Sequence, residues 1–302
     1  MVKKNEMFGL LMVFVGAVLW GTLSLFVKTA NMDAYMFTAL RYLIASLFLM
    51  PFIFRGGIPF NRDFICFVAS YVVLGVTLVF SIMYTANAIA IGMQFTAPLW
   101  VFVYNFCRGK RFAKRHLLPL GLILAGLLVF MLTPGEGVTW YGNLLALFSG
   151  ILFGLLTIFS ARVETDNPIG MTGIGNAVGF AAMLACYFVF GGGIGDFVDL
   201  SGAQWAQVVF VGIFQTAGGF TLFNIGLKYA DTQKASVIST MELVSSVVLV
   251  AIFLQEYPDV FSVIGSLLII CGIVCQFFMA GREQARVSGC ERTDESLVNR
   301  AD

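Results

Sequence analysis

Charged residues are scarce in this sequence. Only 12% of its 302 residues are Asp, Glu, Lys or Arg, whereas 59% are hydrophobic. Soluble domains carry about 25% charged residues, so this composition excludes a soluble globular protein. The net charge of +1 provides no basic surface for a nucleic acid partner.

Histidine is nearly absent, which removes most catalytic and metal sites. The single histidine, His116, lies in a basic loop, and no carboxylate pair falls inside an apolar run. The six cysteines are scattered, without a ligand cluster beside them, and we expect buried, inert thiols. We therefore expect neither an enzyme nor a bound metal or cofactor.

Long hydrophobic runs are abundant instead. About 20 apolar residues cross a bilayer, and windows of this length predict an all-α integral membrane protein of ten transmembrane helices. The predicted spans are 7–27, 34–54, 64–84, 88–107, 117–132, 140–161, 169–190, 205–227, 235–255 and 260–280. Residues 64–107 carry no charge, and we place the turn that divides them at Thr85-Ala86-Asn87. The first run is interpreted as a retained helix rather than a signal peptide.

The basic residues predict the orientation. With the N-terminus inside, all of the 18 Lys and Arg residues except Lys28 and Arg41 fall in cytoplasmic segments, as the positive-inside rule requires. This predicts a multi-pass protein of the inner or plasma membrane with both termini in the cytoplasm. Residues 281–302 are polar and of mixed charge, so we expect a disordered cytoplasmic tail.

The chain also repeats itself. A shift of 133 lays residues 18–26 on 151–159 with matching Gly, hydroxyl and aromatic positions, and a shift of 145 lays Pro98 on Leu243. Two five-helix units, residues 1–137 and 138–280, follow from this. Because five is odd, the second unit must be inverted relative to the first. Inverted repeats are typical of secondary transporters, whose site lies near the midplane between the halves, although some channels share this architecture.

Four short motifs support a family resemblance. They are Leu19-Trp20-Gly21, Ala39-Leu40-Arg41-Tyr42-Leu43-Ile44-Ala45, Thr96-Ala97-Pro98-Leu99, and Met241-Glu242-Leu243 followed by Leu254-Gln255-Glu256. With them, residues 8–280 resemble the EamA-type members of the drug/metabolite transporter superfamily. The resemblance implies transport of amino acids, amines, nucleosides or related metabolites, with proton coupling or exchange. Leu243 stands where that family usually has proline, so we expect the ninth helix to be straighter than the fourth.

Arg41 and Glu242 are the two formal charges well inside predicted spans. Such residues are costly in lipid and are functional hypotheses by default. Counting about 1.5 Å per residue along straight helices separates them by about 10 Å in depth, so we expect separate roles. For Glu242 we expect substrate or proton binding, because Ser239, Ser245 and Ser246 share its face. For Arg41 we favour an anchor that snorkels to the outer headgroups over a gate or an anion contact.

Other polar or aromatic groups are candidates for the wall of a central cavity. They are Trp20, Ser24, Gln94, Thr157, Gln215 and Asn224, together with Ser239 and Ser246. Ser, Thr, Asn and Gln in membrane helices mostly bond to their own backbone or join helices, so each is individually more typical of a structural role. Pro98 removes a backbone hydrogen bond to Gln94, which predicts a kink or hinge in the fourth helix.

The sequence therefore predicts a secondary transporter of a small organic metabolite that works by alternating access in the lipid bilayer, as a monomer or a homodimer. The alternative readings are a facilitative channel and a multidrug exporter of cationic or aromatic compounds.

Overall fold

A computed structural model describes residues 5–84, 92–109, 117–130, 132, 139–190, 192–193, 197, 199–255 and 259–298. In these residues every regular element is a helix. The elements are α1 (Glu6–Ala30), α2 (Ala34–Ile53), α3 (Arg62–Tyr84), α5 (Ala97–Cys107), α6 (Leu117–Phe130), α7 (Trp140–Arg162), α8 (Pro168–Val189), α10 (Gly202–Phe210), the π-helical segment η2 (Val211–Gly218), α11 (Gly219–Tyr229), α12 (Thr232–Ser239), α13 (Met241–Leu254) and α14 (Val260–Val298).

Each predicted span overlaps one or more of these helices. In the described part of the chain, six stretches are long and apolar enough to cross a membrane: Glu6–Leu23, Ala34–Ile53, Trp140–Arg162, Pro168–Val189, Gly202–Tyr229 and Thr232–Leu254. α6 and the apolar part of α14 are shorter. The predicted turn at Thr85-Ala86-Asn87 lies outside the described residues.

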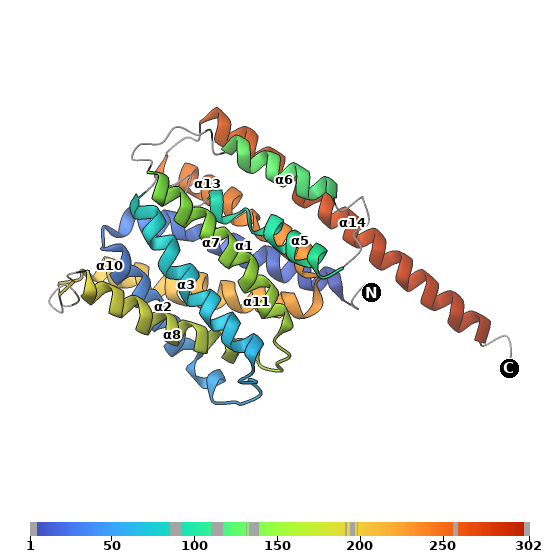
Figure 1. Ribbon diagram of the computed structural model, residues 1–302, viewed down its shortest axis with the longest axis horizontal. Coiled ribbons are helices and arrows are strands. Elements are labelled where there is room, and N and C mark those ends of the chain that lie inside the picture. The colour runs from blue at the N-terminus through green and yellow to red at the C-terminus, as the bar shows by residue number, and fades with distance from the viewer. Residues whose placement is uncertain are drawn as a thin grey trace.

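The helices run back and forth between two ends of one bundle (Figure 1). Three contacts gather helix ends at one of them: Glu6 with Lys234, Asn167 with Phe52, and Asp63 with Arg162. Because Arg55, Arg162 and Lys228 also lie there, we call it the basic end. α1, α3, α8 and α12 begin at this end, and α2, α7 and α11 finish there.

The opposite end is tied by its own contacts. The rings of Tyr35, at the start of α2, and Phe190, after α8, stack at 5.5 Å, and Thr139, before α7, donates a hydrogen bond to the carbonyl of Tyr84 in α3. Consequently α1 and α7 begin at opposite ends, as do α2 and α8. Equivalent helices of the two halves therefore run in opposite directions.

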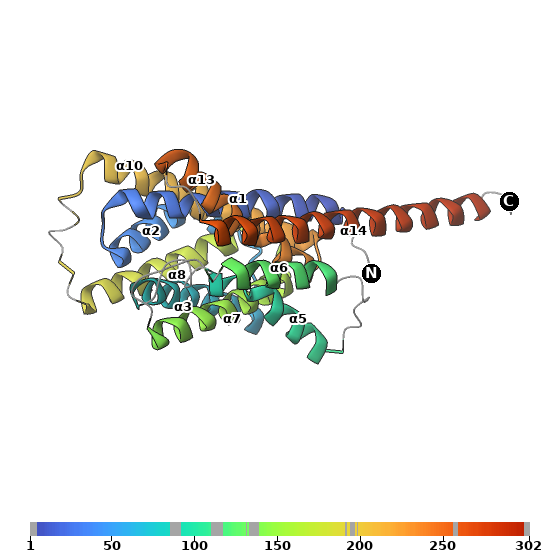
Figure 2. The same cartoon turned by 90° about the horizontal axis from the view of Figure 1, so that it is seen from above.

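Helices of the two halves also pack against each other in equivalent pairs. α3 packs on α7 and α1 packs on α11, while α5 packs on α7 and both α12 and α13 pack on α1. α2 packs on α8, and α6 packs on α14 along one edge of the bundle (Figures 1 and 2). Swapping the first five spans for the last five reproduces this set of pairs, which is what a pseudo-two-fold axis between the halves requires.

Glycines allow α1 and α11 to approach closely. A Cβ at Gly9 would lie 2.8 Å from the carbonyl oxygen of Gly226, and a Cβ at Gly16 would lie 2.8 Å from that of Gly219. Small residues facing each other bring helix backbones together in membrane proteins. We call these four residues the glycine seam.

The fourth and ninth spans are both interrupted, which corrects the expectation of a straight ninth helix. α5 begins after a turn at Thr96, and α13 is separated from α12 at Thr240. Each threonine hydroxyl donates to the carbonyl three residues earlier, to Met93 at 2.8 Å and to Val237 at 2.7 Å. A hydroxyl that captures a backbone carbonyl competes with the helical ladder, so the second break needs no proline.

The C-terminal segment also differs from the prediction. Residues 281–298, expected to be disordered, continue α14 as one helix to Val298, which projects from the bundle in Figure 1. Glu, Gln, Ala and Arg, which are good helix formers, make up much of this segment.

Candidate binding site

Arg41 lies inside the bundle rather than at its surface. Its side chain is 6% exposed, its Nη1 donates to Gln215 Oε1 at 3.2 Å, and its guanidinium carbon lies 5.0 Å from the centroid of the Tyr42 ring. These contacts contradict the snorkelling anchor that we favoured from the sequence. The guanidinium is held instead between α2 and η2.

The π-helical segment places Gln215 for this contact. A π-helical turn adds a residue to the helix and shifts the side chains that follow, and such segments are frequent at functional sites. Gln215 Oε1 also accepts a hydrogen bond from Thr216 Oγ1 at 2.7 Å. On the same face, Gly212 leaves room for the backbone of α2, because its Cβ would lie 3.1 Å from the Arg41 carbonyl oxygen.

Glu242 lies in the first turn of α13, directly after the break at Thr240. A carboxylate is favourable there because the helix dipole is positive at this end. Its side chain is partly exposed, and among the described residues nothing donates a hydrogen bond to its carboxylate. The separate roles expected for Arg41 and Glu242 remain a prediction.

Trp20 forms an aromatic wall near these charges. It is 2% exposed, and its ring centroid lies 4.6 Å from that of Phe220, which in turn lies 4.8 Å from that of Tyr71. The next residue, Gly21, packs against Ser245 of α13. α1 thus carries the indole beside the helix that bears Glu242.

Among the described residues, ten buried side-chain polar atoms have no hydrogen-bond partner, and Trp20 Nε1, Arg41 Nε and Gln94 Oε1 are three of them. Buried polar atoms in proteins are almost always satisfied, and an exception calls for an explanation such as a ligand. The open donors of Trp20 and Arg41 are therefore candidates for contact with a polar solute.

Several predicted cavity residues are used structurally. Thr157 donates to Phe153 O at 2.9 Å, Ser239 to Ser236 O at 2.8 Å and Ser246 to Leu243 O at 2.8 Å, each within its own helix. The side chain of Ser24 lies outside the described part of the structure.

Asn224 is fully engaged between helices. Its Oδ1 accepts from Ser160 Oγ at 2.5 Å, and its Nδ2 donates to Thr172 Oγ1 at 2.8 Å. In this way it links α7, α8 and α11. Of the predicted residues, the structure brings Arg41 and Gln215 into contact.

Two neighbours of Arg41 were missed from the sequence. The Tyr71 hydroxyl donates to Asn176 Oδ1 at 2.8 Å, and the rings of Tyr42 and Tyr71 lie 5.6 Å apart. Tyr42 directly follows Arg41, which was the available signal. Tyr71 comes from α3 and has no sequence feature that separates it from the other aromatic residues.

Two polar contacts join α12 to α1 and α5. Lys234 Nζ lies 2.9 Å from Glu6 Oε2, and the two side chains are 9% and 3% exposed. The neighbouring Gln233 Nε2 donates to the carbonyl of Pro98 at 3.0 Å. We call the Glu6–Lys234 ion pair and the Gln233–Pro98 hydrogen bond the latch, because they join α12 to α1 and α5. Pro98 therefore offers its carbonyl to the latch.

The chain is similar to known transporters along most of its length. The profile of the EamA-like transporter family matches residues 7–132 and again residues 140–278. An uncharacterized transporter of Archaeoglobus fulgidus is 27% identical, over 87% of this chain and 93% of its own. The uncharacterized inner membrane transporter YicL of Salmonella typhimurium is 25% identical, over 93% and 98%.

A solved crystal structure shares the fold. It superposes with a TM-score of 0.77 at 21% sequence identity, over 91% of this chain and 98% of the other.

Proposed function

Because this chain belongs to the EamA-like transporter family and is a membrane transporter, we propose that it carries a small zwitterionic solute, of the amino acid class, by alternating access. A buried cation and a carboxylate inside the bundle, Arg41 on α2 and Glu242 on α13, support this substrate class. The two charges come from different halves of the chain, and among the described residues nothing donates a hydrogen bond to the Glu242 carboxylate.

Each group has a defined role in this proposal. Glu242 receives the ammonium of the solute, and Arg41, held by Gln215, receives its carboxylate, for which a guanidinium is well suited. The indole N–H of Trp20 supplies a further donor to the carboxylate. Trp20 and Phe220 form the aromatic surface along which the apolar part of the solute packs.

The proposed topology has ten spans as two inverted five-helix units, residues 1–137 and 138–280. Basic loops remain in the cytoplasm, so the basic end faces inward and both termini are cytoplasmic, in the inner or plasma membrane. The opposite directions of α1 and α7 support this arrangement.

We propose that Arg41 and Glu242 also determine how transport is coupled. With the site empty, Arg41 can neutralise Glu242; a bound solute replaces this attraction with its own ammonium and carboxylate. A carrier of this kind exchanges solutes without obligatory protonation of Glu242. Proton coupling is the competing mechanism, because a carboxyl in a partly desolvated site can also bind and release a proton.

Proteoliposome transport with three related probes tests the substrate class. Uptake of radiolabelled leucine is measured in competition with leucine, with isoamylamine, which lacks the carboxylate, and with isocaproate, which lacks the amine. Wild-type protein should prefer leucine to both analogues by about tenfold or more, since unpaired buried charges cost 2 kcal/mol or more. Equal inhibition by all three compounds would exclude zwitterion recognition.

Two variants separate the roles of the charges. Arg41→Gln should abolish the discrimination against isoamylamine, and Glu242→Gln should abolish the discrimination against isocaproate. Asp63→Asn, at the basic end, serves as a charge-removal control and should change neither. Repeating leucine uptake with an imposed pH gradient tests coupling: a gradient response in wild type that Glu242→Gln lacks would favour the proton mechanism over exchange.

A further inference from the structure

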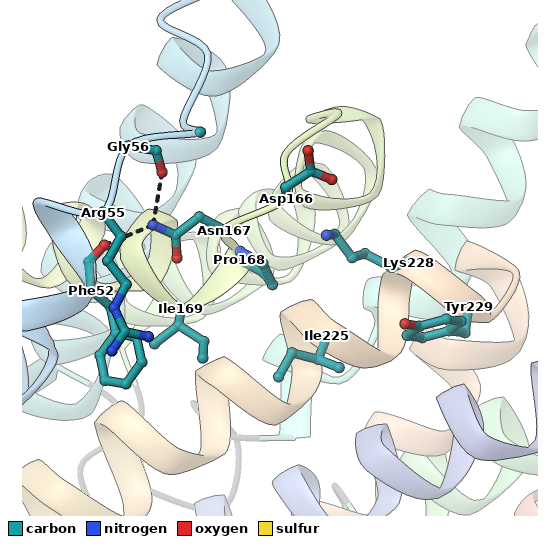
Figure 3. A pocket seen from close by; sticks show the side chains of 11 residues that line it. Phe52, Arg55, Gly56, Asp166, Asn167, Pro168, Ile169, Ile225, Lys228 and Tyr229 are labelled. Carbon is teal, nitrogen blue, oxygen red and sulfur yellow. Dashed lines mark hydrogen bonds between the residues drawn. The ribbon is translucent and has the colours of Figure 1, made fainter.

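A pocket lies at the basic end, and neither Arg41 nor Glu242 lines it. Its volume is about 480 Å³, and it lies between the end of α2, the start of α8 and the end of α11 (Figure 3). α2 belongs to the first half of the chain, and α8 and α11 belong to the second. A molecule in this pocket would contact both halves at once.

The charged groups in the pocket are predominantly basic. Arg55 and Lys228 enter it from opposite sides, and Asp166 is the acidic residue in its lining (Figure 3). The guanidinium carbon of Arg55 lies 4.4 Å from the centroid of the Phe52 ring. Stacking of this kind holds a guanidinium in one orientation while leaving its N–H groups open to a ligand.

The wall between the two cations is preformed. Asn167 Nδ2 donates to Phe52 O at 2.7 Å and to Gly56 O at 3.0 Å, and its Oδ1 accepts from Gly170 N at 2.8 Å. These bonds fix the α2–α3 connection against the start of α8. They also engage the Asn167 amide, and Arg55 and Lys228 are the basic residues of the lining.

Exposed aromatic residues place the pocket at the level of lipid headgroups. Phe54 and Phe60, on the same α2–α3 connection, are each 77% exposed. Aromatic side chains beside basic residues at the end of a span are characteristic of the membrane interface. Basic pockets between transmembrane helices on the cytoplasmic side bind anionic headgroups.

We propose that this pocket binds the phosphate-bearing headgroup of an anionic phospholipid, between Arg55 of the first half and Lys228 of the second. The headgroup bridges the end of α2 and the end of α11 and thereby stabilises the closed arrangement of the basic end. This proposal rests on the proposed function in one respect, that the basic end faces the cytoplasmic leaflet. It makes no use of the transported solute or of the central charges.

Lipid binding is measured on the full-length protein in detergent by its thermal unfolding midpoint. Phosphatidylglycerol, diacylglycerol and inorganic phosphate are titrated separately. Phosphatidylglycerol should raise the midpoint saturably, whereas diacylglycerol, which lacks the phosphate, should not. Arg55→Gln and Lys228→Gln should each weaken the apparent affinity about fivefold, the effect of one basic residue near an anionic lipid.

Two further variants make the test specific. Arg108→Gln is the matched control, because Arg108 is exposed and also lies over an aromatic ring, with 5.6 Å to the centroid of Tyr104, but does not line the pocket. It should bind phosphatidylglycerol as wild type does. Asp166→Asn should strengthen binding, because it removes the opposing charge.

Three results would overturn the proposal. If Arg108→Gln weakened phosphatidylglycerol binding as much as Arg55→Gln does, the lipid would be attracted to basic residues in general and not to this pocket. Equal stabilisation by diacylglycerol would mean that the headgroup is not recognised. Stabilisation by inorganic phosphate with the same dependence on Arg55 and Lys228 would assign the pocket to a soluble anion. None of these results bears on zwitterion transport, so the two proposals fail independently.

Discussion

Thr96 and Thr240 occupy equivalent positions in the two halves of the chain. Each threonine hydroxyl donates to the carbonyl three residues before it, at 2.8 Å and 2.7 Å. The carbonyl of each threonine accepts from the backbone N–H three residues after it, that of Leu99 at 2.9 Å and that of Leu243 at 3.1 Å. The two breaks are therefore built in the same way. The two breaks set a register of 144 between the halves, one residue less than the shift of 145 taken from the sequence. In this register Glu242 matches Pro98, so the second half carries a charge where the first half carries a helix breaker.

We expect Thr240→Val to slow transport more than it lowers stability. Loss of the hydroxyl removes one hydrogen bond, worth about 1 kcal/mol, and returns the Val237 carbonyl to the helical ladder, which favours a continuous helix through Glu242. Initial uptake rates and thermal midpoints check this. The control is Thr77→Val, since Thr77 donates to Val73 O and Leu74 O within the continuous helix α3. A similar loss of transport in Thr77→Val would remove the special role of the break.

The latch at the basic end gives a second prediction. Glu6→Gln removes the carboxylate that lies 2.9 Å from Lys234 Nζ, in a site where both side chains are under 10% exposed, and breaking a buried pair costs about 3–5 kcal/mol. The thermal midpoint should fall markedly. The double variant Glu6→Lys with Lys234→Glu should recover part of the loss, since opposite charges face each other again.

The exposed pair provides the comparison for the latch. Asp63 and Arg162 lie 3.2 Å apart with side chains 25% and 40% exposed, so Asp63→Asn should cost less than about 1 kcal/mol. If Asp63→Asn destabilises the protein as much as Glu6→Gln does, burial of the latch is not the reason for its strength.

The glycine seam predicts opposite effects for the same substitution. Gly16→Ala brings a methyl group 2.8 Å from the carbonyl oxygen of Gly219, and relief requires a shift of backbone, at a cost of about 1–3 kcal/mol. Gly121→Ala in α6 meets nothing within 4 Å and should stabilise by about 0.5–1 kcal/mol, because alanine is the better helix former. Thermal midpoints of both variants, in the same detergent, give the comparison.

Gln215→Leu should weaken solute binding without changing the fold. The substitution removes the acceptor that holds Arg41 Nη1 at 3.2 Å, so Arg41 is less well positioned for the solute carboxylate. The KM for leucine should rise severalfold while the maximal rate changes less. Asn224→Leu is the contrasting variant: because Asn224 bonds to Ser160 and Thr172, it should lower the thermal midpoint and leave the KM of the folded fraction unchanged.

Hydropathy predicted the positions of the helices well, because runs of about 20 apolar residues have few alternatives in a bilayer. Predicted bounds for the second span, 34–54, and the sixth, 140–161, end within one residue of α2 and α7. The break at Thr240 was missed because proline was the signal being sought. A threonine at the same place in both halves, 144 residues apart, was the signal that could have found it.

The sequence predicted which residues belong to the candidate site better than it predicted their contacts. Arg41 and Glu242 stood out because charge inside a span is rare, but the contact of Arg41 with Gln215 depends on the π-helical segment η2, which hydropathy does not record. Asn224 and Thr157 were predicted to line a cavity because their side chains are polar. In the structure these side chains bond to neighbouring helices or to their own backbone, which depends on helix packing and cannot be predicted from residue type.

The glycine seam bears on how the proposed alternating access would work. The backbones of α1 and α11 approach closely along it, yet the two helices belong to different halves of the chain. We expect them to move together, because sliding or rotation of one past the other would bring the backbones into steric overlap. The surface that opens and closes would then cut across both repeats instead of running between them.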